Sequence, residues 1–194
     1  MAFVIGLCGN LCSGKSTVAQ ILGERGAKII DADEVSRAVS AAGTPVFEEI
    51  VLAFGKGVLD SGGSIDRAKL GKAVFSDPEK RKVLERITHP AIRDEVVRRV
   101  GEESAGGATV VVIEAALLSR GGVLGEIVDT LVLVDASEEV KIKRVAERDG
   151  LDEAEAKRRL KAQEGRNPDW DFVIDNSGGL EGLRKKVENL WERF

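Results

Sequence analysis

Hydrophobic residues along the chain alternate between short continuous runs and runs with helical spacing. The segment AFVIGLC at 2–8 is one continuous run and predicts a buried β-strand. The next periodic segment places Val18, Ile21 and Leu22 on one face of a helix, and AKIID at 27–31 predicts a short second strand. Strands that alternate with helices in this way are typical of an α/β protein with a parallel sheet.

The second half of the chain repeats this alternation. The β-branched run ATVVVIEAALL at 108–118 predicts a central parallel strand, and DTLVLVDA at 129–136 and DFVID at 171–175 predict two more. Two charged helices are expected between them, at about 137–148 and 152–163. A closing helix is expected to bury an apolar stripe made of Leu180, Leu183, Val187, Leu190 and Trp191. We therefore expect a parallel sheet that is covered by helices on both faces.

The segment between the second and third strands has a helical pattern. It extends from Asp33 to about Leu84, with a glycine-rich break at 55–66 that predicts a loop. The pairs Asp77-Pro78 and His89-Pro90 each predict the start of a helix, because proline is tolerated at the first helical position. No repeat, low-complexity tract or linker divides the chain, so one domain is expected over residues 1–194.

Composition narrows the class of protein. The chain has 194 residues, of which 43% are hydrophobic and 32% are charged, as in soluble globular proteins. No apolar run approaches the roughly 20 residues that cross a bilayer, and the N-terminus does not resemble a signal peptide. The formal net charge of −4 argues against nucleic acid or an anionic membrane as a partner. Cys8 and Cys12 are expected to be free thiols in a reducing cytoplasm rather than a disulfide or a metal site.

The segment GNLCSGKS, residues 9–16, fits the phosphate-binding pattern G-x-x-x-x-G-K-[ST] in full. Glycines allow successive N–H groups to point at phosphate oxygens, and the following helix adds its positive N-terminal end. Lys15 is expected to bridge the β- and γ-phosphates of a nucleotide, and the Ser16 hydroxyl to ligate Mg²⁺. A chance glycine turn with a surface lysine is the alternative, but a strand before the segment and a helix after it favour the phosphate loop. The expected nucleotide-binding residues are Gly9, Asn10, Leu11, Cys12, Ser13, Gly14, Lys15, Ser16 and Thr17.

A second group of polar residues follows the second strand, in DADEVSR at 31–37. Ligands of α/β proteins bind at the carboxyl ends of parallel strands, so an aspartate here could orient an acceptor hydroxyl and take its proton. Asp33 is the candidate for this role, whereas Asp31 could instead cap the helix. Arg37 lies one helical turn after Asp33 and could hold a substrate anion or pair with Asp33.

Several segments, in order along nearly the whole chain, resemble the pattern of the dephospho-CoA kinase family. They are IGLCGNLCSGKSTVA, IIDADEVSR, FG, GGSIDRAKLGKAVF, LERITHPAIR, ALL, AERDG, Gln163 and DFVIDNSG. The resemblance implies transfer of the γ-phosphoryl group of ATP to the ribose 3′-hydroxyl of dephospho-CoA, the last step of coenzyme A synthesis. It also implies a fold like that of nucleoside monophosphate kinases, with a five-stranded parallel core, a helical acceptor-binding region at about 32–92 and a helical lid at about 137–163.

The resemblance assigns roles by position. Asp33 becomes the base, and the residues along the dephospho-CoA side become Arg37, Asp66, Arg67, His89 and Arg93. His89 has no implied role in proton transfer, and from the residues alone a structural position at a helix start is slightly favoured. Besides Ser16, Glu114 would reach Mg²⁺ through water.

The lid and the end of the last strand supply the remaining candidates. Arg144 is the first candidate, and Arg148 the second, to neutralise charge on the γ-phosphate when the lid closes. The alternative is a solvated helix of mixed charge, which explains most of the side chains in this segment. Asn176 could read the edge of adenine or belong to an ordinary turn.

Two segments depart from the family pattern. The family usually shows approximately D-x-P-L-L-F-E where this chain has EAALLSR, so Ala116 replaces proline and Ser119-Arg120 replaces Phe-Glu. These changes affect expected acceptor contacts and leave the catalytic residues in place. The middle of the phosphate loop, NLC at 10–12, is also bulkier than usual.

Two other functions fit the phosphate loop. One is a different small-molecule or nucleotide kinase of the same fold. The other is a nucleotide switch that hydrolyses slowly and signals by ordering loops. A GTP-reading switch would be expected to carry an N-K-x-D segment, and the sequence has none.

Overall fold

The computed structural model describes residues 1–75, 77–116, 118–161 and 170–194. The chain forms two compact units, which we call the sheet unit (Met1–Asp31 with Val100–Phe194) and the helical unit (Ala32–Arg99). The helical unit has nearly the bounds of the acceptor-binding region expected at 32–92. Gln163 and the end of the second expected lid helix lie outside the described residues.

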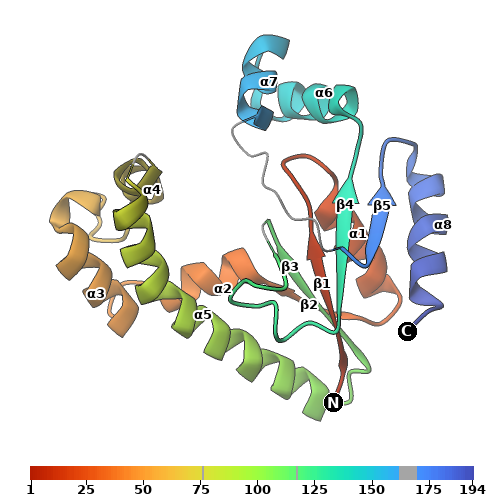
Figure 1. Ribbon diagram of the computed structural model, residues 1–194, viewed down its shortest axis with the longest axis horizontal. Coiled ribbons are helices and arrows are strands. Elements are labelled where there is room, and N and C mark those ends of the chain that lie inside the picture. Colours follow the sequence, from red (N-terminus) through yellow and green to blue (C-terminus); the bar gives the residue numbers. More distant parts are fainter. Residues whose placement is uncertain (76, 117, 162–169) are drawn as a thin grey trace. The chain divides into compact units, whose positions relative to one another are not determined.

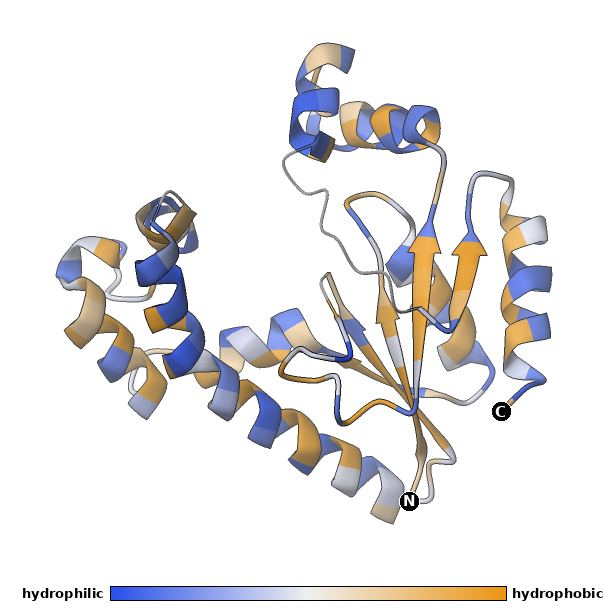
Figure 2. Cartoon of the chain, in the orientation of Figure 1, coloured by the Kyte–Doolittle hydropathy of each residue, from blue (hydrophilic) through white to orange (hydrophobic). Residues whose placement is uncertain are grey.

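The sheet unit is built on five parallel strands, as the hydrophobic runs predict (Figure 1). Their order is β2-β3-β1-β4-β5, and every pairing is parallel. The strands are β1 (Phe3–Cys8), β2 (Lys28–Asp31), β3 (Val110–Ala115), β4 (Thr130–Asp135) and β5 (Phe172–Asp175). Residues of the three central strands, β3, β1 and β4, are largely buried and hydrophobic (Figure 2), which suits a parallel sheet covered on its faces, whereas the edge strands β2 and β5 each have one buried residue.

Two helices of the sheet unit pack together into the main hydrophobic core. They are α1 (Lys15–Glu24) and α8 (Leu180–Trp191). Val18, Ile21 and Leu22 of α1 are buried there, as expected, beside Leu183 and Val187 of α8. Leu180 does not join them: it is 56% exposed, so its expected place in the buried stripe is wrong. It is the first residue of α8, and its side chain lines a cavity described below.

Gly6 of β1 has no side chain, and this allows Leu118 and Val128, from the segment between β3 and β4, to pack against the sheet. A Cβ on Gly6 would come within 3.0 Å of side chains of Leu118, Val128 and Leu131. Arg120, one of the departures from the family pattern, lies in this segment, and its guanidinium pairs with the Asp171 carboxylate just before β5. The Asp171 carboxylate also accepts a hydrogen bond from the Leu131 N–H at 2.7 Å, so Arg120 has a structural partner at the start of β4 and β5.

The segment expected to form a lid contains two helices, α6 (Glu138–Asp149) and α7 (Glu153–Lys161), close to the expected 137–148 and 152–163 in the described residues. Ile142 and Val145 of α6 are buried against Ala156 and Leu160 of α7. Ser137 caps α6 by accepting a hydrogen bond from the Val140 N–H, and Gly150 ends it in a left-handed conformation.

The helical unit contains four α-helices, α2 (Ala32–Val39), α3 (Pro45–Phe54), α4 (Arg67–Phe75) and α5 (Pro78–Ala105), the last of which continues into the sheet unit. A short 3₁₀ turn, Lys56–Val58, begins the loop expected at 55–66. Val46, Ile50, Val58 and Leu70 form the core of this unit. None of the helices in the described part of the chain is long and apolar enough to cross a membrane.

Of the two helix starts predicted at prolines, one is confirmed and one is wrong. Asp77 does begin α5, because its carboxylate accepts hydrogen bonds from the N–H groups of Glu79 and Lys80 at 3.1 Å. His89-Pro90 does not begin a helix, since α5 continues through Pro90. An interior proline costs about 3 kcal/mol, but side chains on both sides of it, from Leu84 and Ile87 to Ala91, pack on the core of the helical unit. Tertiary packing therefore keeps the helix continuous.

Candidate active site

The phosphate loop connects β1 to α1 and opens onto the N-terminal end of that helix. Gly14 is the N-cap of α1, with φ of 90°, and the first turn of the helix carries no acidic residue. The free N–H groups and the positive end of the helix dipole therefore remain available to an anion. This is the structural setting, strand before and helix after, that distinguishes a phosphate loop from a chance glycine turn.

Both glycines of the motif are required by the space around them. A Cβ on Gly9 would lie 2.5 Å from the carbonyl oxygen of Val134 and 2.5 Å from Ser13 Oγ. A Cβ on Gly14 would overlap the side-chain amide of Asn176, and the left-handed φ would strain any other residue. Gly9 thus permits a close approach to β4, whereas Gly14 permits the turn itself.

Glu114 joins the two chemically active residues of the loop. It pairs with Leu7 across the β1–β3 register, so its side chain leaves the sheet beside the end of β1. Its Oε1 accepts a hydrogen bond from Ser16 Oγ at 2.8 Å and from Lys15 Nζ at 3.1 Å. The Lys15 and Glu114 side chains are only 17% and 13% exposed, which strengthens their ion pair relative to one in open water.

The donor set beside this ion pair suits Mg²⁺. Magnesium prefers hard oxygen ligands and keeps several waters, and a serine hydroxyl beside a carboxylate oxygen provides such a site at the end of the phosphate loop. No cluster of three or more His, Cys, Asp or Glu residues that could hold a metal alone occurs among the described residues. A magnesium ion here would therefore depend on the nucleotide for further ligands.

Ser13 carries an unsatisfied polar group inside the loop. Ser13 is 0% exposed, and the described residues supply no hydrogen-bond partner for its buried Oγ. Its main-chain carbonyl, by contrast, accepts a hydrogen bond from Asn176 Nδ2 at 2.8 Å. A buried hydroxyl without a partner is unfavourable, so the loop interior would gain from an acceptor such as a phosphate oxygen.

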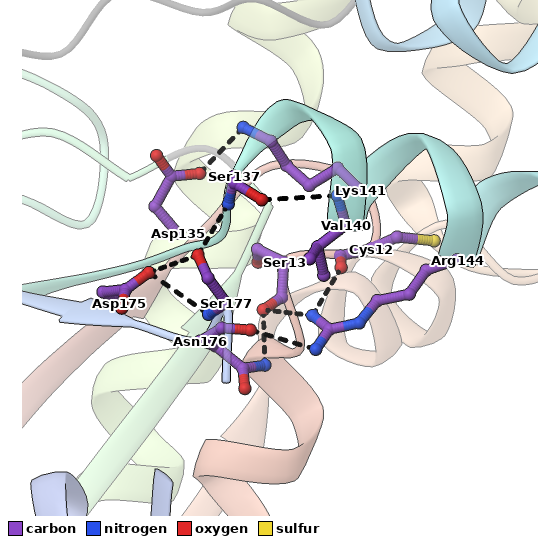
Figure 3. A network of polar contacts seen from close by, with 10 residues as sticks. All are labelled: Cys12, Ser13, Asp135, Ser137, Val140, Lys141, Arg144, Asp175, Asn176 and Ser177. Carbon is purple, nitrogen blue, oxygen red and sulfur yellow. Dashed lines mark hydrogen bonds and ion pairs between the residues drawn. The ribbon is translucent and has the colours of Figure 1, made fainter. Parts of the chain in front are cut away.

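Arg144 of α6 is bound to the main chain of the loop (Figure 3). Its Nη1 donates to the carbonyl oxygens of Cys12 at 3.3 Å and Ser13 at 3.4 Å, and its Nη2 donates to the carbonyl oxygen of Asn176 at 3.0 Å. Arg148, one turn later, pairs with Asp149 at 2.8 Å and lies nearer the surface. The expected role of these arginines on the γ-phosphate stays a prediction, and the structure adds a contact that fixes Arg144 beside the loop.

A cavity of about 370 Å³ adjoins this network, within the size range of small-molecule sites. Its lining includes Arg144, Arg148 and Asn176, which the sequence singled out. It also includes three residues that sequence analysis missed as site residues: Gly178, Leu180 and Leu183. Leu180 is exposed because it lines this cavity and does not pack in the core.

A second polar network connects the ends of β4 and β5 to the start of α6 (Figure 3). Lys141 Nζ pairs with Asp135 Oδ1 at 2.9 Å, and the Ser137 N–H donates to Ser177 Oγ at 2.8 Å. Ser177 Oγ in turn donates to Asp175. Hydrogen bonds from Ser177 and Lys186 lower the pKa of Asp175 to about 2. The start of α6 is therefore fixed to the ends of β4 and β5, a feature with no local signal in the sequence.

The helical unit brings together three of the expected acceptor residues. Asp33 lies in the first turn of α2, Arg37 lies in its last turn, and Arg67 begins α4. The pKa of Arg67 is lowered by partial burial and by the positive charge of Arg37, while the negative charge of Asp33 opposes this shift. One carboxylate and two guanidinium groups thus act on one another in this unit.

The other expected acceptor residues have structural contacts of their own. The Asp66 carboxylate caps α4 by accepting hydrogen bonds from the N–H groups of Ala68 and Lys69, both at 3.0 Å, and these bonds lower its pKa. His89 and Arg93 lie four residues apart on α5 and so share a face. Acceptor contacts by these three residues stay predictions.

The comparison with known proteins agrees with the geometry of the phosphate loop. A family model described as dephospho-CoA kinase matches residues 3–182. A dephospho-CoA kinase from Geobacter sulfurreducens is 44% identical over 193 residues and covers 98% of each chain, and one from Moorella thermoacetica is 44% identical over 196 residues, 99% of this chain and 92% of the relative.

Several solved structures also resemble this chain in fold. A protein from Thermus thermophilus, TT1252, matches with a TM-score of 0.81 at 33% identity, over 100% of this chain and 98% of that one. A dephospho-CoA kinase from Campylobacter jejuni matches with a TM-score of 0.69 at 27% identity, over 100% and 97% of the two chains. A shikimate kinase from Bacteroides thetaiotaomicron, at 15% identity and a TM-score of 0.53, shares the fold, over 98% and 97% of the chains.

Proposed function

Because the chain belongs to the dephospho-CoA kinase family, we propose that it phosphorylates the ribose 3′-hydroxyl of dephospho-CoA with ATP, giving coenzyme A and ADP. The observation that carries the proposal is the junction of Lys15 and Ser16 on one oxygen of Glu114, at the mouth of a phosphate loop. In the reaction the bond between the γ-phosphorus and the β,γ-bridging oxygen breaks. A bond to the 3′-oxygen forms, and the hydroxyl proton leaves to a base.

ATP is assigned to the sheet unit. The N–H groups of residues 9–17 would hold the phosphates, and Lys15 would exchange Glu114 for the β- and γ-phosphate oxygens. The adenosine would occupy the 370 Å³ cavity beside Arg144 and Asn176. Closure of α6 and α7 would place arginine charge near the γ-phosphate and exclude water.

Magnesium is assigned to Ser16 directly and to Glu114 through water, next to the nucleotide phosphates. When bound, the ion would draw negative charge from the phosphate oxygens and orient them for transfer. Before the nucleotide binds, Glu114 holds Ser16 and Lys15 close together, because both donate to the same carboxylate oxygen.

Dephospho-CoA is assigned to the helical unit. Asp33 would accept the proton of the 3′-hydroxyl, and Arg37 and Arg67 would bind the anionic part of the acceptor. Asp66, His89 and Arg93 would contribute around them. Both cysteines are free thiols, and we expect the enzyme to work in a reducing cytoplasm.

A panel of acceptors offered with Mg-ATP tests the proposal. We expect ADP release that depends on dephospho-CoA, with coenzyme A as the second product, and no comparable turnover with shikimate, gluconate or nucleoside monophosphates. Lys15→Ala should abolish turnover, which separates this activity from a contaminating kinase. Turnover of a different acceptor would favour another kinase of the same fold, and ADP release without any acceptor would favour a nucleotide switch.

A further inference from the structure

One face of α4 in the helical unit carries a hollow of about 380 Å³. It is lined by three residues spaced four apart along the helix, Arg67, Gly71 and Phe75, and by the residues that follow the first two, Ala68 and Lys72. This spacing places all of them on one side of α4. None of these residues lines the nucleotide cavity, so the hollow is a separate feature.

Gly71 lines the hollow, and nothing in the described chain requires a glycine at this position. It lies in the middle of α4, where glycine costs about 1 kcal/mol relative to alanine. Its φ is not in the left-handed region, and no heavy atom of the described residues comes within 4 Å of where its Cβ would be. Neither the turn of the backbone nor packing within the described chain requires the missing side chain. The absence of a side chain at Gly71 leaves this part of the hollow open.

Phe75 forms one end of the hollow and is 76% exposed. A phenylalanine ring that is left in water forfeits its burial energy, about 1.5–3 kcal/mol for a side chain of this size. It lies two turns after Arg67 on the same face. The ring therefore offers an apolar surface to a molecule that lies along the helix.

The hollow is also cationic, because Arg67 lies at the end away from Phe75 and Lys72 lies between the two along the helix. Lys72 forms no ion pair or hydrogen bond with any residue that the structure describes, and Arg67 Nη2 donates to Ser40 Oγ at 3.4 Å, directly after α2. This contact links the face of α4 to the helix that carries Asp33 and Arg37. An anion at Arg67 would therefore lie close to the expected site of the reacting hydroxyl.

We propose that this face of α4 binds the acceptor beyond its ribose, with the diphosphate at Arg67 and Lys72 and the pantetheine arm over Gly71 and Phe75. The inference rests on the proposed function, which places the ribose 3′-hydroxyl at Asp33. Adenine is attached to the same ribose and stays beside it, whereas Phe75 lies about 12 Å along the helix from Arg67, at 1.5 Å per residue. Only the arm extends that far past the diphosphate, and its methyl groups and methylenes suit an exposed aromatic ring.

The test is to fill the hollow with a side chain at Gly71. Gly71→Leu should raise the KM for dephospho-CoA about tenfold or more and leave the KM for ATP unchanged. The milder Gly71→Ala should raise it less while also raising the melting temperature, because alanine favours the helix. Gly101→Leu is the matched control, since Gly101 is another helical glycine with open space around its Cβ and lies outside the hollow.

Two fragments of the acceptor identify which part occupies the hollow. 4′-Phosphopantetheine should compete with dephospho-CoA in the wild type and in Gly101→Leu, but at least tenfold more weakly in Gly71→Leu. AMP should inhibit all three proteins equally. An unchanged KM in both Gly71 variants, or a loss of AMP inhibition in place of 4′-phosphopantetheine inhibition, would overturn the assignment of the arm. A wild-type protein that does not phosphorylate dephospho-CoA would instead overturn the proposed function.

Discussion

Lys15 and Glu114 form a largely buried ion pair between the phosphate loop and the end of β3, with Nζ 3.1 Å from Oε1. The same oxygen accepts a hydrogen bond from the Ser16 hydroxyl, so one carboxylate fixes both residues that are expected to contact the nucleotide. The lysine is thereby held in an ordered position before any phosphate arrives, and its charge is compensated in a region of low exposure. Two residues that lie 99 positions apart in the chain thus act as one unit.

Glu114→Gln is the first substitution that follows from this relationship. The amide keeps the size of the side chain but loses the charge that balances Lys15 and that would orient water on the proposed magnesium ion. We expect kcat to fall about 10²-fold, with a higher magnesium concentration needed for half-maximal rate. Steady-state kinetics across a magnesium titration would measure both effects, and an unchanged magnesium dependence would remove Glu114 from the metal site.

Arg144→Met tests whether the arginine acts on the phosphates or only on the loop. Arg144 donates to three main-chain carbonyls, so its loss should weaken ATP binding and raise the KM for ATP. If it also reaches the γ-phosphate in the closed enzyme, kcat should fall about 10²-fold or more at saturating ATP. Arg148→Met is the matched control, because Arg148 lies one turn later and pairs with Asp149, and a smaller loss is expected. A higher KM with unchanged kcat in Arg144→Met would limit its role to holding the loop.

The sheet was predictable because its signal is local and repeated. Each buried run of β-branched residues became a strand within one to three residues of the expected bounds, and all five strands are parallel. The phosphate loop was predictable for the same reason: its glycines, lysine and serine act within one turn of the chain. Asp77 and Pro78 likewise begin α5 through hydrogen bonds to neighbouring residues.

Features that depend on distant contacts were not predictable. Pro90 carries a local stop signal, and packing of Ile87 and Ala91 on the helical core overrides it. Leu180 fits the apolar period of α8, yet a cavity at the start of that helix leaves it exposed. The contact of Arg144 with Ser13 joins residues 131 positions apart, and no spacing rule in a single sequence contains it.

Cys12→Val tests the strain in the middle of the phosphate loop. Cys12 is the residue other than glycine that has a positive φ in the described chain, at 56°, and its side chain packs on the apolar cluster between α6 and α7. A β-branched residue is especially unfavourable in this left-handed conformation, so we expect a loss of about 1–2 kcal/mol in the free energy of unfolding. Urea denaturation would measure it. Cys8→Val is the control, because Cys8 is a buried strand residue where a β-branched side chain fits, and an equal loss in both variants would contradict the role of φ.

Asp175 gives a prediction for stability in acid. Hydrogen bonds from Ser177 and Lys186 lower its pKa to about 2 from an ordinary value of 3.8. A lowered pKa means that the folded state binds the proton less readily, so the stabilisation is complete above about pH 4 and is lost as the pH falls to about 2. Asp175→Asn should therefore lower the melting temperature at pH 7 and bring it nearer the wild-type value as the pH approaches 2. The side chain is 60% exposed, so the effect should be modest, and melting curves with a constant difference from pH 5 to 2 would contradict it.

Asp33→Asn separates chemistry from binding at the acceptor. The amide keeps the shape of the side chain and its hydrogen-bonding reach, but it cannot accept the hydroxyl proton. We expect kcat to fall by about 10²–10⁴-fold, the usual contribution of a positioned base, while the dissociation constants for ATP and dephospho-CoA change little. Calorimetric binding of each substrate beside single-turnover kinetics would measure the two parts. Asp31→Asn is the matched control, because Asp31 ends β2 two residues earlier and should keep most of the activity. If Asp31→Asn lost turnover and Asp33→Asn kept it, the base would be the other carboxylate of the pair.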